Sequence, residues 1–369
     1  MVDSYLLLKF APTLVWDAQR NPLRDQSAMI EKRIKELPKV DLHRHLEGSI
    51  RLETVAEIVR EHSLPLPQDV ETLRRAVQVD EEDRKDPDRF LSKFKNIRKI
   101  FHSPEVIQRV TSEAIEDAAR DRVRYLELRF TPAALAQSGL FTLEDVSGWV
   151  MDAAAESAAA QGIEVRLIVS INRHESLEKA EEAARIAVDH MDEGVVGLDL
   201  AGDEVEFPAG AFRSILASAK QAGLGLTIHA GEWSAAENVR QAILDLGADR
   251  IGHGIRVLED AQVTALARER GIPFEVSITS NYLTGVIPSL DAHPLPQMLQ
   301  AGLRTVLTTD DPSIFGITLS HEYQYAVDHL GLSLESLKGF ILTAVQAAFL
   351  DRRKIRQFEK EFIDTFWRP

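Results

Sequence analysis

The chain has 369 residues, a formal net charge of −15 and a pI near 5.3. An acidic chain without a basic patch is poorly suited to polyanions, so neither nucleic acid nor membrane is expected as a partner. The absence of cysteine excludes disulfides, thiolate zinc sites and cysteine nucleophiles. Any transition-metal site must therefore use His, Asp and Glu, and we expect a cytoplasmic protein.

An apolar segment, LLLKFAPTLVW, lies close to the start of the chain at residues 6–16. It is interrupted by Lys9 and Pro12, is shorter than the ~20 residues of a membrane span, and lacks the basic region that begins a signal peptide. We expect it to pack against the body of the protein.

Eight short apolar runs alternate with longer segments of helical periodicity. The runs cover residues 39–46, 124–130, 164–171, 195–202, 225–232, 250–254, 274–279 and 305–311. Alternating strands and helices form parallel βα units, and eight of them predict an α/β fold closed as a (β/α)8, or TIM, barrel. An open doubly wound sheet is the alternative, but no glycine-rich phosphate loop follows the first run.

Two regions depart from this alternation. Residues 1–35 precede the first strand as an N-terminal extension, and residues 50–120 form a helical insertion after it. No low-complexity linker marks a second domain, so we expect a single domain over residues 1–369. The insertion begins at the carboxyl end of strand one, where barrel active sites are built, and is interpreted as a lid.

Polar residues collect at the carboxyl ends of the predicted strands. A histidine at such a place is usually a hydrogen-bonded structural residue, and Asp-Asp before Pro312 is typical of a turn. In a barrel, however, these ends meet at one face, and together they indicate one site, formed by His43, His45, His229, Glu232, His253, Asp310 and Asp311. The histidines in helical or loop sequence are interpreted as ordinary structural residues: His62, His102, His190, His293 and His321.

The residue types at this face suggest a metal-dependent hydrolase. Three imidazoles and one carboxylate suit a single Zn²⁺, and less specifically Fe²⁺, Co²⁺ or Ni²⁺; the predicted ligands are His43, His45, His229 and Asp310. Such a metal lowers the pKa of its bound water towards ~7, which supplies hydroxide at neutral pH. Glu232 lies three residues beyond a ligand and would reach towards the substrate. His253 and Asp311 would flank the water, giving hydrolytic attack on an electrophilic carbon.

Over essentially its whole length the sequence resembles the adenosine deaminase family of metal-dependent barrels. The resemblance is carried by PKVDLHRHLEGSIR (38–51), FLSKF (90–94), DLAGDE (199–204), HAGE (229–232), RIGHG (250–254), SNYLTG (280–285) and TTDDPSIFG (308–316). Any one of these motifs is weak alone, but HAGE, RIGHG and TDDP in this order and spacing are highly specific.

The resemblance implies a reaction, and a role for each matching residue. A metal-bound hydroxide attacks C6 of adenosine or 2′-deoxyadenosine, a small-molecule purine nucleoside, and gives inosine and ammonia. His43, His45, His229 and Asp310 match the zinc ligands, His45 also lying against the substrate. Glu232 matches the residue that protonates purine N1, and His253 the group that orients and deprotonates the water. Further matches are Asp311 at N7, Gly202 with its N–H at N3, and an apolar gate of Phe90, Leu91 and Phe94.

Two positions depart from the family pattern. Glu47 stands where nucleoside-specific members usually have Asp, near the ribose, and Glu is similar to some adenine and modified-nucleoside deaminases; YLTG at 282–285 is closer to the adenosine-specific branch. Ser277-Ile278 replaces a Cys-Pro pair, which should affect packing more than chemistry. The alternative substrates are therefore adenine and N6- or 5′-modified adenosines.

Two further classes are weaker alternatives. Binuclear barrel hydrolases of esters and amides usually use a carboxylated Lys after strand four, and the fourth run here ends LDLAG without one. A non-catalytic nucleoside-binding barrel would be expected to lose Glu232, His253 or Asp311, and the chain has all three. The sequence leaves the oligomeric state open.

Overall fold

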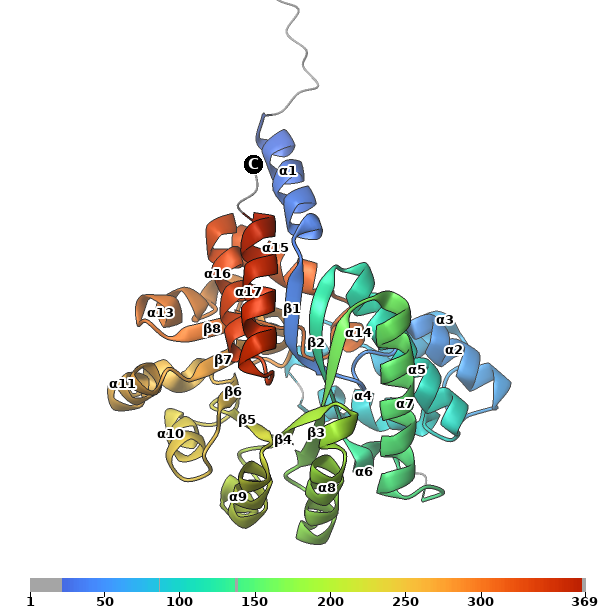
Figure 1. Cartoon of the computed structure of the whole chain (residues 1–369). Coiled ribbons are helices and arrows are strands. Elements are labelled where there is room, and N and C mark those ends of the chain that lie inside the picture. Colours follow the sequence, from blue (N-terminus) through green and yellow to red (C-terminus); the bar gives the residue numbers. More distant parts are fainter. Residues whose placement is uncertain (1–21, 86, 137–138, 367–369) are drawn as a thin grey trace, which may run out of the picture.

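The fold was examined in a computed structural model, which describes residues 22–85, 87–136 and 139–366. Its centre is one parallel sheet of eight strands in sequential order (Figure 1). The strands are β1 (Lys39–His45), β2 (Val123–Phe130), β3 (Glu164–Asn172), β4 (Val195–Ala201), β5 (Gly225–Ala230), β6 (Arg250–His253), β7 (Pro273–Val276) and β8 (Arg304–Leu307). The predicted (β/α)8 barrel is confirmed. Because the strands are buried on both faces, they appear in the sequence as nearly continuous apolar runs.

The sheet closes through a single parallel bridge between Arg44 of β1 and Asp310, just beyond β8. The His45 N–H donates to the Asp310 carbonyl at 2.9 Å, and the Asp310 N–H donates to the His43 carbonyl at 2.8 Å. The seam of the barrel therefore joins predicted site residues from opposite ends of the chain.

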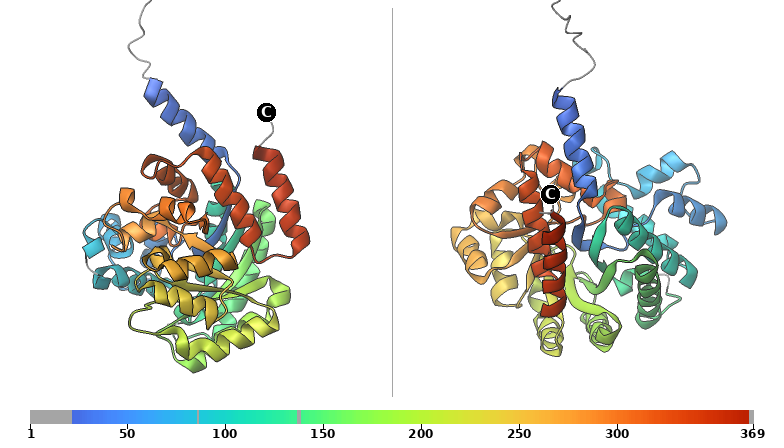
Figure 2. Two further views of the ribbon diagram at one scale, coloured as in Figure 1. Left: turned by 90° about the vertical axis from the view of Figure 1, so that its left-hand side faces the viewer. Right: turned by 45° about the horizontal axis from the view of Figure 1, so that its top comes forward.

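Helices surround the barrel and cover its outer face (Figures 1 and 2). The first half of the chain supplies α1 (Pro22–Glu36), α2 (Leu52–Glu61), α3 (Val70–Val77), α4 (Pro87–Ile97), α5 (Pro104–Arg120), α6 (Pro132–Leu135), α7 (Leu143–Gln161) and α8 (Leu177–Asp189). The second half supplies α9 (Arg213–Ala222), α10 (Ala236–Leu244), α11 (Ala261–Arg270), α12 (Ile278–Leu283), α13 (Leu295–Gln300), α14 (Pro312–Phe315), α15 (Leu319–Asp328), α16 (Leu334–Ala347) and α17 (Arg352–Phe366).

The region predicted as a helical insertion contains α2 to α5. Helices α2 and α3 project from one side of the barrel (Figure 1), whereas α5 packs along β2 and α7. Helix α5 therefore lies among the helices that surround the barrel, and α2 to α4 are the added elements. Short 3₁₀ helices, Asp83–Lys85 and Arg98–Ile100, flank α4.

Two predicted strands extend three or more residues too far. The run 274–279 ends as a strand at Val276, and α12 begins at Ile278, because the buried Glu322 carboxylate accepts the Ile278 N–H at 2.6 Å and the Thr279 N–H at 3.1 Å. The run 305–311 ends as a strand at Leu307. In both cases the polar residues follow the strand rather than belonging to it.

No helix among the described residues is long and apolar enough to cross a membrane. The apolar segment at residues 6–16, expected to pack against the body of the protein, lies outside the described residues.

Candidate active site

The four predicted metal ligands lie together at the carboxyl ends of the strands. His43 Nε2 is 3.2 Å from both His45 Nε2 and Asp310 Oδ1, and His45 Nε2 is 3.4 Å from the same oxygen. The His229 ring centroid is 4.7 Å from that of His43 and 5.5 Å from that of His45. Because three lone-pair atoms gather around one point, the donor set fits a small cation.

A cation could be held by more than one combination of these residues. Two overlapping groups have ligand atoms within 4.8 Å of one another: His43, His229, His253 and Asp310, and His45, Asp199 and His229. The predicted four include members of both groups. All the ligand types are nitrogen and oxygen, as a chain without cysteine requires.

Two buried carboxylates behind the cluster orient its histidines. Glu275 Oε2 lies 2.8 Å from His43 Nδ1, and Asp199 Oδ1 lies 3.0 Å from His229 Nδ1. An ionised carboxylate can only accept, so each Nδ1 carries the hydrogen and each Nε2 keeps its lone pair for a metal. Arg129 pairs with both carboxylates, at 2.9 Å from Glu275 and 3.3 Å from Asp199.

The sequence analysis did not identify these orienting residues. Asp199 lies within the DLAGDE motif and Glu275 within FEVSIT, but both read as polar interruptions of buried strands. The available signal was a pair of carboxylates inside strands that are otherwise apolar, since a charge there needs a buried partner.

The electrostatics of the cluster favour neutral His45 and His229 beside an ionised carboxylate, whereas the Asp310 and Glu275 carboxylates raise the pKa of His43 despite its burial. Burial lowers the pKa of His45 well below its ordinary value, and that of His229 below it as well. Burial alone would raise the pKa of Asp310, but the adjacent imidazoles of His43, His253 and His45 outweigh it and hold this pKa well below its usual range. These are the protonation states in which such groups bind metals.

Backbone strain also concentrates at the site. His253 and Asp310 have φ values of 59° and 62°, in the left-handed region that non-glycine residues seldom adopt. His253 ends β6, and Asp310 forms the bridge that closes the barrel. Strain of this kind persists only where the surrounding structure imposes it, and it clusters at functional sites.

Glu232 reaches the same cluster from the loop after β5. Its Oε2 is 3.6 Å from His253 Nε2, which in turn is 3.8 Å from Asp310 Oδ2. Burial, reinforced by the charge of Asp310, raises the pKa of Glu232 to about 8. At neutral pH this side chain is therefore a protonated acid that can donate a proton.

A second carboxylate, Glu204, holds the loop that carries Glu232. It is buried and accepts four consecutive backbone N–H groups, those of residues 231 to 234, at 2.7–2.9 Å. It also accepts from the Asn238 amide at 2.9 Å. Glu204 belongs to the DLAGDE motif, but the sequence analysis gave it no role.

Asp311 and Glu47 are buried carboxyls close to the cluster. Burial, with the charges of Asp310 and Glu47, raises the pKa of Asp311 well above its usual value, and burial raises that of Glu47. Glu47 Oε1 accepts the Thr131 N–H at 2.8 Å. Among the described residues, Asp311 Oδ1 and Glu47 Oε2 have no hydrogen-bond partner. Gly48 lies against this pair, because a Cβ there would be 1.8 Å from Asp311 Oδ1.

The predicted purine-contacting and gate residues lie on loops and helices around the site. Gly202 follows β4 with φ of 94°, and a Cβ there would meet the Arg173 nitrogen at 3.4 Å. Phe90 and Phe94 of α4 contact each other with ring centroids 5.4 Å apart, and Phe90 lies 6.3 Å from Trp233, next to Glu232. The side chain of Leu91 lies outside the described residues.

One histidine interpreted as an ordinary structural residue lies beside the site. His293 is 1% exposed, and its Nε2 is 3.2 Å from Asn281 Oδ1; the Asn281 amide nitrogen is 3.2 Å from His253 Nδ1. The sequence analysis did not connect these residues, because His293 lies in loop sequence forty positions beyond His253.

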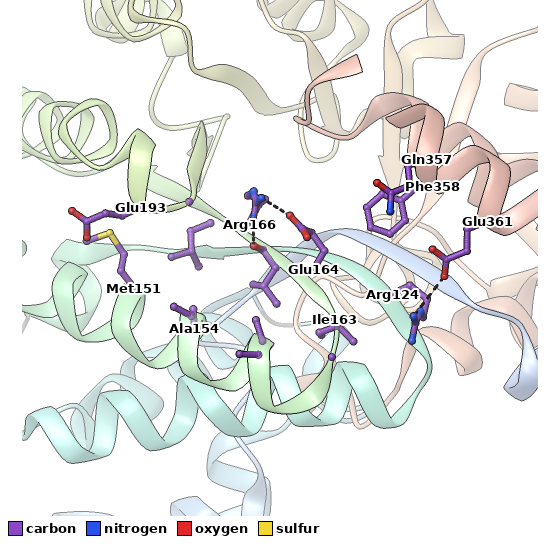
Figure 3. A pocket seen from close by; sticks show the side chains of 17 residues that line it. Arg124, Met151, Ala154, Ile163, Glu164, Arg166, Glu193, Gln357, Phe358 and Glu361 are labelled. Carbon is purple, nitrogen blue, oxygen red and sulfur yellow. Dashed lines mark hydrogen bonds and ion pairs between the residues drawn. The ribbon is translucent and has the colours of Figure 1, made fainter. Parts of the chain in front are cut away.

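A cleft of about 520 Å³ lies away from this cluster, at the amino end of β3 (Figure 3). It is lined by alanines of α7, by Glu164 and Arg166 of β3, and by Phe358 and Glu361 of α17. Within it Glu164 pairs with Arg166, and Arg124 lies 3.5 Å from Glu361. The cleft has neither a histidine nor a buried carboxyl, and its charges are paired.

Comparison with known proteins identifies the family. The family model described as adenosine deaminase matches residues 38–365. The adenosine deaminase of Shigella flexneri is 37% identical over 327 residues, covering 87% of this chain and 97% of that protein. The chain belongs to the adenosine deaminase family.

Solved structures of the family's fold include enzymes with different named substrates. Adenine deaminase from Arthrobacter aurescens aligns with a TM-score of 0.82 and 27% identity, covering 89% of this chain and 99% of its own. The N6-mAMP deaminase of Arabidopsis aligns at 0.80 and 30%, covering 90% and 99%. An amidohydrolase from Burkholderia ambifaria, with bound Zn, aligns at 0.81 and 25%, covering 91% and 92%.

Proposed function

We propose that this family member is a zinc-dependent deaminase of adenosine and 2′-deoxyadenosine. The observation that carries the proposal is the buried acid Glu232, with a raised pKa, beside a convergent set of three histidines and Asp310. A protonated acid next to a cation site is what hydrolysis of an aminopurine requires, because the ring must gain a proton while its C6 gains an oxygen.

His43, His45, His229 and Asp310 would hold one zinc ion, and the Nδ1 contacts of Glu275 and Asp199 fit that arrangement. When bound, the ion lowers the pKa of a water and so supplies the nucleophile at neutral pH. The bound zinc of the Burkholderia structure supports the choice of metal.

The chain's own groups would handle the purine. The Glu232 carboxyl gives its proton to N1, which makes C6 electrophilic, and oxygen from water replaces the C6 amino group, which leaves as ammonia. Asp311, whose pKa is raised well above its usual value, would donate to N7 in its protonated form. The Gly202 N–H would meet N3, because the left-handed backbone there excludes a side chain beside the ring.

Residues 50–120 would cover the bound substrate as part of a single domain over residues 1–369. Phe90 and Phe94 support this lid role, because their rings lie on α4 next to the loop that carries Glu232. Burial of the purine behind these rings would exclude bulk water from the acid.

A second candidate is deamination of adenine or of an N6- or 5′-modified adenosine. It is favoured by Glu47, whose longer side chain occupies the position expected near the ribose, and whose Oε1 is already used by the Thr131 N–H. The names of the Arthrobacter and Arabidopsis relatives also point in this direction.

The test offers adenosine, 2′-deoxyadenosine, adenine and N6-methyl-AMP in parallel to the zinc-loaded protein. It follows the loss of adenine-ring absorbance and the release of ammonia, or of methylamine from N6-methyl-AMP. We expect the highest kcat/KM with the two nucleosides, and loss of turnover on chelation that added zinc restores. A preference for adenine or N6-methyl-AMP would establish the second candidate. Turnover of none of them with zinc bound would contradict both.

A further inference from the structure

A buried chain of hydrogen bonds links His253 to the backbone of α13. The Leu295 N–H donates to His293 Nδ1 at 3.0 Å, His293 Nε2 meets Asn281 Oδ1 at 3.2 Å, and the Asn281 amide nitrogen meets His253 Nδ1 at 3.2 Å. Each of the three side chains is at most 1% exposed. These hydrogen bonds join the end of β6, which carries His253, to α12, which carries Asn281, and to the segment before α13, which carries His293.

The donor and the acceptor of every hydrogen bond in this series follow from the first bond, in which the Leu295 N–H meets His293 Nδ1. A backbone N–H can only donate, so His293 Nδ1 must accept from Leu295 and carries no hydrogen. A neutral imidazole has one ring hydrogen, so His293 must bear it on Nε2 and donate it to the Asn281 carbonyl oxygen. The Asn281 nitrogen then faces His253 and donates to its Nδ1.

The opposite orientation of Asn281 is chemically excluded. If its nitrogen faced His293, then His293 would have to accept at both Nδ1 and Nε2, which only an anionic imidazolate could do. The orientation of the amide therefore does not depend on how its oxygen and nitrogen were assigned. Burial lowers the pKa of His293 to about 3, which is consistent with a neutral ring.

We propose that Asn281 and His293 are positioning residues that lock His253 as the neutral tautomer with its hydrogen on Nε2. That hydrogen faces the cluster, where Glu232 Oε2 lies at 3.6 Å and Asp310 Oδ2 at 3.8 Å. The backbone of His253 is left-handed, with φ of 59°. Since Nδ1 accepts and Nε2 donates, His253 has no free lone pair.

This assignment has two consequences, the second of which rests on the proposed function. An Nε2 that carries a hydrogen does not ligate a cation, so His45 rather than His253 completes the metal set with His43, His229 and Asp310. In the reaction, His253 orients and stabilises the attacking oxygen as a hydrogen-bond donor. The proton of the water then passes to the Glu232 carboxylate, which is ionised once it has given its own proton to N1. This differs from the base role that the family resemblance implied for His253.

The tautomer can be read directly by NMR of the zinc-loaded protein labelled with [¹⁵N]histidine. Long-range ¹H–¹⁵N correlations distinguish a protonated ring nitrogen from one with a lone pair, and the signals of His253 are assigned by their loss in His253→Gln. We expect His253 and His293 both to be protonated at Nε2. A wild-type His253 protonated at Nδ1 would overturn the proposal.

Three variants separate tautomer control from packing. Asn281→Asp places an acceptor opposite His253 Nδ1 and should move its hydrogen from Nε2 to Nδ1, with kcat reduced ~10- to 100-fold and KM little changed. His293→Phe breaks the chain and should lower kcat similarly. His293→Gln offers an oxygen to Leu295 and an N–H to Asn281, so it should keep both the tautomer and most of the rate.

His321→Gln is the matched control, because His321 also accepts a backbone N–H at Nδ1, from Thr318 at 2.9 Å, but lies exposed at the start of α15. This variant should change neither the tautomer of His253 nor kcat. Wild-type kcat in Asn281→Asp with a shifted tautomer would refute the positioning role. If no purine is turned over, the proposed function fails, while the NMR spectrum still decides the tautomer.

Discussion

The two ends of the barrel both bury ionisable side chains. Those at the amino end are paired with opposite charges, whereas several acidic groups at the carboxyl end have no such partner. Towards the amino end, Glu127 accepts from the Tyr125 hydroxyl at 2.7 Å, from the Phe349 N–H at 2.7 Å and from Arg250. Arg250 also donates to Glu275 at 2.6 Å and lies 3.7 Å above the Phe349 ring. Each of these charges faces an opposite charge, and Arg250 donates a hydrogen bond from each of its three guanidinium nitrogens.

At the carboxyl end, acidic side chains are gathered without cations of their own. The pKa values of Glu232, Asp311 and Glu47 are all raised, chiefly by burial, and Asp310 adds its charge to the first two. Such an arrangement lowers stability unless something else supplies positive charge or hydrogen-bond donors. Buried carboxylates paired with arginine hold the barrel and its histidines in place, whereas buried carboxyls without such a partner mark the site.

The cleft on the outer surface, at the amino end of β3, also has paired charges. The cleft beside β3 is larger than a water pocket, yet its charges are paired: Arg166 with Glu164 and Arg124 with Glu361 within it (Figure 3), and Glu193 with His190 outside it. A hollow alone does not make a reaction site; the placement of unsatisfied groups does.

The largest effect should come from Glu232→Gln, which keeps the shape of the side chain but removes its acidic proton. We expect kcat to fall ~10²- to 10⁴-fold while the zinc content, measured by atomic emission, stays the same. A rate close to wild type would show that Glu232 does not protonate the substrate.

Next in size is Asp199→Asn, which leaves a neutral side chain behind His229. Asp199 also accepts from Ser170 at 2.8 Å and pairs with Arg129, so its loss should loosen the orientation of the ligand. We expect zinc affinity to weaken ~10- to 100-fold, as measured by competition with a chelator. Unchanged affinity would mean that the imidazole is held by the strand alone.

The pH profile should follow the raised pKa of Glu232. Below about 8 the carboxyl is protonated and can donate; as the pH rises through this value the proton is lost. We expect kcat/KM to fall by about tenfold per pH unit on this limb. The limb should be absent from the residual activity of Glu232→Gln, and its persistence there would assign it to another group.

Glu127→Gln tests whether the paired charges at the amino end of the barrel contribute to stability rather than to catalysis. Arg250 would lose one of its two carboxylates in a fully buried position, so the free energy of unfolding should fall by about 3 kcal/mol, as measured by urea denaturation. The kcat of the folded variant should match that of wild type. A large fall in kcat would show that the paired charges of the amino end also control the chemistry.

The smallest effect is expected from Arg124→Gln in the cleft. Arg124 and Glu361 are both nearly half exposed and 3.5 Å apart, and solvent screens such pairs, so stability should change by less than about 0.5 kcal/mol. Neither kcat nor zinc affinity should change. A clear loss of either would give the cleft a role that its paired charges do not predict.

The sequence was sufficient for the barrel and for the composition of the site. Alternation of buried runs with helical segments predicts parallel βα units without knowledge of any contact, and an odd polar residue at the end of such a run stands out from its surroundings. That is why His43, His229 and Asp310 could be grouped before their distances were known. The end of β7 was less predictable, because a buried carboxylate from α15 decides where the backbone leaves the sheet.

Only the tertiary structure could supply the direction of hydrogen bonds and the cost of burial. Asp199, Glu275 and Glu204 look like isolated polar residues in the sequence, and their roles appear when the barrel closes around them. The same holds for His293, which reaches His253 through Asn281. Residue type and spacing determine which groups meet at the carboxyl end. The protonation state of each group depends on its hydrogen-bond and charge partners and on its loss of contact with water. Both the partners and the burial are set only when the chain folds.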